Sequence, residues 1–195
     1  MNKYELKINQ NKLELAVAIG FSLIIFALSS TKLGYIQISP EWNLDMGIIP
    51  AIFAAMIGGY RVGLPVSIVW AVITYLNPAS NLQDYTIYGL LIERITLVTI
   101  AYGAYKMCKK RFDRSPANVY RAVIAAITAK NIASYIILAV MLDVDAWMVH
   151  AAQQYLLELA LTSLAMSFLI KHLRQVHILN GVKRREKAKA LKASK

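Results

Sequence analysis

The chain has 195 residues, of which 57% are hydrophobic and 17% are charged, and its mean hydropathy is +0.46. These values exclude an ordinary soluble domain of this length and leave room for a single domain. The net charge of +11 is compatible with a nucleic-acid-binding protein, but the positions of the basic residues indicate membrane topology instead.

Six apolar segments follow one another along the chain, each long or nearly long enough to cross a bilayer at about 1.5 Å per residue. They are Leu13–Ser30, Met46–Tyr60, Val62–Leu76, Tyr85–Met107, Val119–Leu142 and Trp147–Ile170. Segments that are apolar nearly all the way round are typical of helices in lipid. The sequence predicts an all-α integral membrane bundle of six transmembrane helices over residues 1–175, followed by a basic tail over 176–195.

The second and third segments are short and are separated only by a glycine-rich turn between Gly58 and Gly63. Glycine permits a tight turn and close backbone approach. One continuous helix across both segments is the alternative, but Pro65 and three glycines argue against it. We therefore expect a hairpin of two short helices.

The basic residues are distributed unevenly between the two sides of the predicted membrane. With a cytoplasmic N-terminus, 19 of the 22 Lys and Arg residues fall in cytoplasmic segments, whereas the outer loops contain mainly acidic residues such as Glu41 and Asp45. This asymmetry obeys the positive-inside rule and places both termini in the cytoplasm of a cell-membrane protein. The basic tail is expected to lie on the anionic inner leaflet rather than to bind nucleic acid.

Charged side chains at membrane depth usually face a cavity, one another or the bundle interior. The sixth segment places Trp147, His150, Gln154 and Glu158 within an arc of roughly 80°, because helical residues advance about 100° each. These residues define a candidate ligand site that opens outward, to which the fourth and fifth segments add Tyr85, Glu93, Lys130 and Asn131. Arg94 points to a different helix, and the first outer loop, with Tyr35, Gln37 and Trp42, is a candidate lid or short hairpin.

Two other interpretations of these residues remain open. Glu93, Lys130 and Glu158 are also consistent with interhelical ion pairs that only fix packing. Aromatic residues near helix ends, such as Trp147, are more often interfacial anchors than ligand contacts. The sequence has no phosphate-binding glycine loop, metal-ligand spacing or nucleophile with an evident base, so we expect neither an enzyme nor a cofactor.

The stretch from Asp45 to Leu64, DMGIIPAIFAAMIGGYRVGL, resembles the second helix and hairpin of substrate-binding S components of energy-coupling factor (ECF) transporters. In these proteins an apolar helix containing proline leads to a G-x-x-x-G turn, here Gly59 to Gly63. The chain also resembles the family in its number of helices, its length, its long first outer loop and the basic connection between its fourth and fifth helices.

The resemblance implies a receptor for a vitamin or similar small polar micronutrient, which works with a transmembrane coupling protein and a pair of ATPases. It also implies a ligand held near the outer side by the last three helices and capped by the first outer loop. The docking motif Ala-x-x-x-Ala of the family is matched here only loosely, by Ala16 with Gly20 and by Ala18 with Ser22.

Two further protein classes share parts of this pattern. The membrane sensor module of LytS-type histidine kinases has a similar G-G-x-x-V-G-L turn, although no kinase domain follows here. Scaffold proteins similar to MreD have comparable size and helix number, and they require protein partners but no small ligand.

Overall fold

The computed structural model describes residues 3–31, 34–39, 42–77, 86–111, 117–141 and 155–169. Its elements are α1 (Lys3–Ser29), β1 (Tyr35–Ser39), β2 (Trp42–Asp45), α2 (Ile48–Gly58), α3 (Tyr60–Leu76), α4 (Ile87–Arg111), α5 (Ala117–Met141) and a final helix, Tyr155–Leu169. Most of the described residues are helical, which confirms the all-α prediction at this level, and the predicted tail lies outside the described residues.

Among these helices, two are long and apolar enough to cross a membrane, at Asn11–Ser29 and Ile87–Cys108. Three shorter apolar helices, Ile48–Gly58, Tyr60–Leu76 and Tyr155–Leu169, accompany them. The structure thus contains helices compatible with a membrane, and the prediction of six spans goes beyond this finding.

The α2–α3 hairpin forms where the sequence predicts it. The chain breaks at Gly59, whose φ of 71° lies in the left-handed region that favours glycine. The two helices then pack closely, because Ala51 and Ala55 are fully buried and Gly63 presents no side chain. A Cβ atom at Gly63 would lie 2.6 Å from Val98 Cγ1 of α4 and 2.9 Å from Ala55 Cβ of α2. Small residues therefore set the spacing of three helices.

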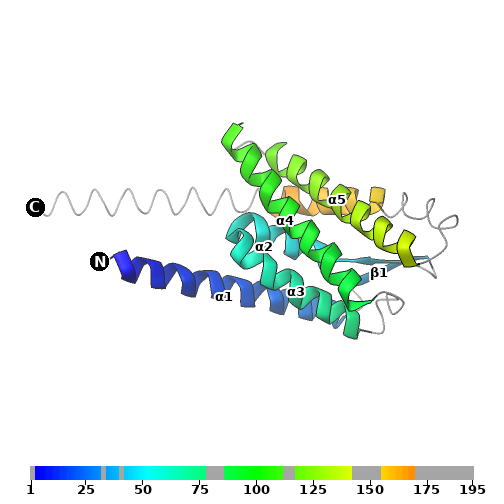
Figure 1. Ribbon diagram of the computed structural model, residues 1–195, viewed down its shortest axis with the longest axis horizontal. Helices are drawn as coiled ribbons and strands as arrows, with labels where there is room; N and C mark the ends of the chain where they lie inside the picture. The colour runs from blue at the N-terminus through cyan, green and yellow to red at the C-terminus, as the bar shows by residue number, and fades with distance from the viewer. Residues whose placement is uncertain are drawn as a thin grey trace, which may run out of the picture.

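The segment between the first and second helices contains the short hairpin that the sequence allows. β1 and β2 pair antiparallel, with Tyr35 opposite Asp45 and Gln37 opposite Asn43. In Figure 1 the hairpin lies at the end of the bundle opposite the start of α1, and α4 packs extensively against α5. The end of β2 therefore enters the bundle beside the C-terminal end of α3 and the N-terminal end of α4.

Candidate functional site

Five charged side chains meet inside the bundle, on four different elements. This charged cluster consists of Asp45 at the end of β2, Glu93 and Arg94 on α4, Lys130 on α5 and Glu158 on the final helix. Each of these residues is between 2% and 7% exposed. Glu93 lies six residues from the start of α4, a depth of about 9 Å along the helix axis. The cluster is therefore buried, and it lies closer to the hairpin end of α4 than to the opposite end.

Asp45 forms one end of the cluster and is surrounded by donors. Its Oδ1 accepts a hydrogen bond from the Gly47 backbone N–H at 2.8 Å, and its Oδ2 accepts one from Trp70 Nε1 at 2.9 Å and one from the Thr74 hydroxyl at 3.2 Å. Arg94 completes the set with a charge-assisted bond of 3.0 Å from Nη2 to Oδ2. Gly47 is required here because a Cβ atom would overlap the Trp70 indole nitrogen.

Arg94 joins this end to the middle of the cluster. Its second terminal nitrogen, Nη1, donates to Glu93 Oε1 at 2.9 Å. The guanidinium carbon also lies 3.7 Å from the centroid of the Trp70 ring, a cation–π contact that is stronger without competing water. Arg94 and Trp70 therefore position each other, and both position Asp45.

Lys130 continues the cluster toward the final helix. Its ammonium group lies 3.5 Å from Glu93 Oε1 and 2.5 Å from Glu158 Oε1. Asn131 donates to the Ile127 carbonyl at 2.9 Å and reaches Glu158 Oε2 at 3.4 Å. The result is an alternating row of charges, Asp45–Arg94–Glu93–Lys130–Glu158, that connects the hairpin, α4, α5 and the final helix.

Two buried hydroxyl groups lie at the Asp45 end of the cluster. They belong to Ser29, which is 3% exposed, and Tyr35, which is 8% exposed. The Tyr35 hydroxyl lies near Ser29 and Thr74, and burial together with the Asp45 carboxylate raises the pKa of Tyr35 above its usual value. Tyr35, Ser29 and Thr74 therefore form a buried group of hydroxyls beside the Asp45 carboxylate.

The structure brings together four of the predicted site residues, Glu93, Lys130, Asn131 and Glu158. Tyr35 lies at the Asp45 end of the cluster, whereas Gln37 is exposed. The backbone of Trp42 belongs to β2, but its side chain lies outside the part that the structure describes. Other predicted site residues lie entirely outside the described residues: Tyr85, Trp147, His150 and Gln154.

Sequence reasoning missed the Asp45 end of the cluster. It placed Asp45 in an outer loop, but the carboxylate is buried and paired with Arg94. It also left out Trp70 and Thr74, which look like ordinary residues of an apolar helix. A signal was present, since an arginine in the middle of an apolar segment requires a buried acid. Two carboxylates adjoin Arg94 in space, and only one of them, Glu93, is its neighbour in sequence.

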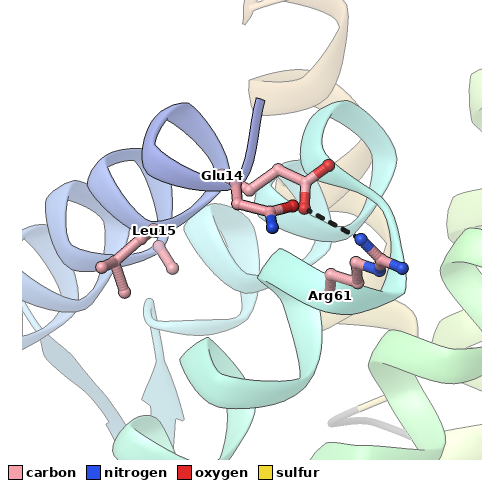
Figure 2. Close-up of a pocket in the computed structure, with 5 residues that line it drawn as sticks. Glu14, Leu15 and Arg61 are labelled. Atoms are coloured by element: carbon pink, nitrogen blue, oxygen red, sulfur yellow. Dashed lines mark ion pairs between the residues drawn. The ribbon is translucent and has the colours of Figure 1, made fainter. Parts of the chain in front are cut away.

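A second polar feature lies where the middle part of α1 faces the start of α3. Asn11, Glu14, Leu15, Ala18 and Arg61 line an open hollow of about 290 Å³ between α1 and the start of α3. Figure 2 shows Arg61 reaching Glu14 across this hollow, with 3.8 Å between the charged atoms. The Arg61 side chain is 73% exposed, so solvent screens this pair and it contributes little.

The candidate docking residues on α1 fall on two faces. Ala18 belongs to the buried core and Ser22 is half-buried. Ala16 is exposed, and a Cβ atom at Gly20 would meet nothing within 4 Å. The pair Ala16 and Gly20 thus leaves a shallow outward surface, while Ala18 packs within the chain.

No family model, curated protein or solved structure matches this chain.

Proposed function

We propose that this chain is the substrate-binding subunit of an ECF-type importer, a multi-pass protein of the cell membrane with six transmembrane helices and cytoplasmic termini. Its task is to bind a small polar micronutrient, while partner ATPases and a coupling protein supply the energy. The charge asymmetry of the sequence and the two long apolar helices support the membrane location.

The observation that carries the proposal is the charged cluster itself. Burying ionised groups costs several kcal/mol each before pairing, and a well-packed apolar core of similar volume is often at least as stable. A chain that holds five such groups in one place, beneath a hairpin and beside the buried hydroxyl groups of Ser29 and Tyr35, has the properties of a polar binding site. Glu93, Lys130 and Glu158 come from three helices, so a ligand there contacts the same elements that the ECF resemblance implies.

One observation favours a second function, an MreD-like scaffold. Each of the five charged residues has an oppositely charged partner within 3.5 Å, as expected of ion pairs that only fix helix packing. In that case the polar groups hold the bundle together and the exposed face of α1 contacts partner proteins.

Native mass spectrometry of the gently purified protein tests the proposal. We expect a small molecule to co-purify with the wild-type chain and to be lost or weakened at least tenfold in Glu158→Gln. The matched control is Glu14→Gln, which removes the same charge from the opposite end of the bundle. Repeated absence of any bound molecule from the wild-type protein would favour the scaffold, and co-purification with an ATPase pair would support transport.

A further inference from the structure

The carboxylate of Asp45 occupies a set of hydrogen-bond donors that belong mostly to the helices. Its Oδ2 accepts hydrogen bonds from Trp70 Nε1 at 2.9 Å, from the Thr74 hydroxyl at 3.2 Å and from Arg94 Nη2 at 3.0 Å. These three donors lie on α3 and α4, whereas the fourth donor, the backbone N–H of Gly47, lies two residues after Asp45 in the chain. Three donors from two helices therefore converge on one oxygen that the hairpin supplies.

The three helical donors are held by contacts that do not involve Asp45. Arg94 donates from Nη1 to Glu93 Oε1 at 2.9 Å, and its guanidinium carbon lies 3.7 Å from the centroid of the Trp70 ring. Trp70 and Thr74 are fully buried on α3, which packs against α4. The α3–α4 pair would therefore present the same donors after Asp45 had moved away, which is the condition for a preorganised anion site.

A second, independent observation is that Arg94 has an unused donor. Its Nε is buried and has no hydrogen-bond partner among the described residues. Nε and Nη2 lie along the same edge of the planar guanidinium, and a carboxylate can bind this edge with both of its oxygens. Asp45 uses only Nη2, since its other oxygen, Oδ1, accepts from Gly47. Asp45 thus fills half of this edge, and a carboxylate that is not tied to the main chain can reach both nitrogens.

The buried arginine determines which kind of ligand can replace Asp45. A neutral or cationic group in its place would deprive the Arg94 guanidinium of one of its two carboxylate partners. A carboxylate from a solute brings the same charge and the same acceptor atoms, so the exchange leaves the charge of the interior unchanged. The class of ligand that fits these donors is therefore an ionised carboxylic acid.

We propose that Arg94, Trp70 and Thr74 form a carboxylate-binding site that Asp45 occupies while no solute is bound, and that the carboxylate of an organic acid displaces Asp45 from it. Asp45 is then an internal competitor, and its displacement releases the end of β2 from α3 and α4. The site depends on these contacts alone. Its role in transport rests on the importer proposed above, for which it assigns the solute to the carboxylic acids.

Chemical rescue tests whether the helical donors bind a free carboxylate. Asp45→Ala leaves Arg94 without this carboxylate and should lower the melting temperature of the protein in mixed micelles. Sodium formate, which is as small as the deleted group, should raise it again by about 3 °C relative to NaCl at equal ionic strength.

Two variants serve as controls for the rescue. The double variant Asp45→Ala/Arg94→Met should not respond to formate, and it should fold at least as well as Asp45→Ala, because removing both members of a buried pair leaves neither of them uncompensated. Glu14→Ala removes a carboxylate whose partner, Arg61, is largely exposed, so it should not respond to formate either.

The wild-type protein tests the displacement of Asp45. Sodium propionate should speed the hydrogen exchange of the β1 and β2 amides by about threefold, because the hairpin loses one of its anchors to the helices. A ligand that left Asp45 in place would slow this exchange or leave it unchanged. Asp45→Asn should bind propionate about threefold more tightly than the wild type in a melting-temperature titration, since a neutral amide competes less well for Arg94.

Absence of rescue by formate, or a rescue that persists in the double variant, would overturn the site. Rescue without faster exchange of β1 and β2 in the wild type would overturn the displacement and leave Asp45 as a permanent packing partner of Arg94. If Asp45→Ala does not fold, the measurements on the wild type and Asp45→Asn decide the question alone, and the absence of both predicted effects overturns the inference.

Failure of the importer proposal is a separate result, decided by native mass spectrometry of the purified protein. Rescue by formate and faster hairpin exchange, with no co-purified molecule, would retain the carboxylate site and remove the receptor function. A co-purified molecule without a carboxylate would retain the receptor and overturn the assignment of its substrate class.

Discussion

The two ends of the bundle are held together by different physical means. Near the hairpin, the elements meet through a row of five buried charges together with Trp70 and Thr74. Near the α2–α3 turn, they meet through small residues such as Ala55 and Gly63, without a buried ion pair among the described residues of that end. Close apolar packing is sufficient to build such a bundle, so the ionic end has a cost that stability alone does not require.

The largest effect is expected from removing Arg94, the cation that lies between Asp45 and Glu93. Arg94→Met leaves Asp45 and Glu93 without their guanidinium and should lower the free energy of unfolding by about 3–5 kcal/mol. Reversible unfolding in mixed micelles measures this change. A loss below about 1 kcal/mol would show that water reaches these carboxylates and that the ionic end is not truly buried.

A smaller loss is expected at the apolar end. Gly63→Val places methyl groups where Val98 and Ala55 already lie, so α3 must shift away from α2 and α4 at a cost of about 2–3 kcal/mol. The same unfolding measurement checks it. The control is Gly103→Ala on α4, where a Cβ atom meets nothing within 4 Å, and equal stability of the two variants would contradict the close packing.

Two variants of Trp70 distinguish the contribution of its ring from that of its N–H group. Trp70→Phe keeps an aromatic face for Arg94 but removes the donor to Asp45, with an expected loss of about 1–2 kcal/mol. Trp70→Leu, which also removes the ring face, should lose more. If the two variants are equally stable, the cation–π contact contributes nothing measurable.

The smallest effect is expected at the exposed pair of the α1 hollow. Arg61→Ala removes a contact of 3.8 Å whose basic side chain is 73% exposed, so the free energy of unfolding should change by less than about 0.5 kcal/mol. Measurements at low and high salt check this, because any residual contribution should disappear at high ionic strength. A loss comparable to that of Arg94→Met would remove the distinction between the two ends.

Much of the fold could be predicted from local patterns. The turn at Gly59 follows from glycines beside Arg61 and Pro65, and the β1–β2 hairpin follows from a long loop that ends before Met46. The convergence of Glu93, Lys130 and Glu158 was predicted because charges on apolar helices must face one another or a cavity. Each of these inferences requires only helical geometry and the cost of burying a charge.

The partner of Arg94 could not be predicted in the same way. Asp45 is separated from it by 49 residues, and its position in an acidic loop gives no sign of burial. Its buried state depends on how far β2 enters the bundle, which in turn depends on Gly47 allowing Trp70 to approach. Sequence spacing contains no information on such an approach between separate elements.

By itself, the sequence determined the helical class and the glycine turn between the second and third helices, and it indicated that Glu93, Lys130 and Glu158 face one another or a shared cavity. Only the tertiary structure decided that Asp45 and Arg94 join these residues, and that the charges form one row from the hairpin to the final helix. The physical reason is that helix formation and charge burial depend on residue type and periodicity, whereas the net charge of a site depends on which distant elements come into contact.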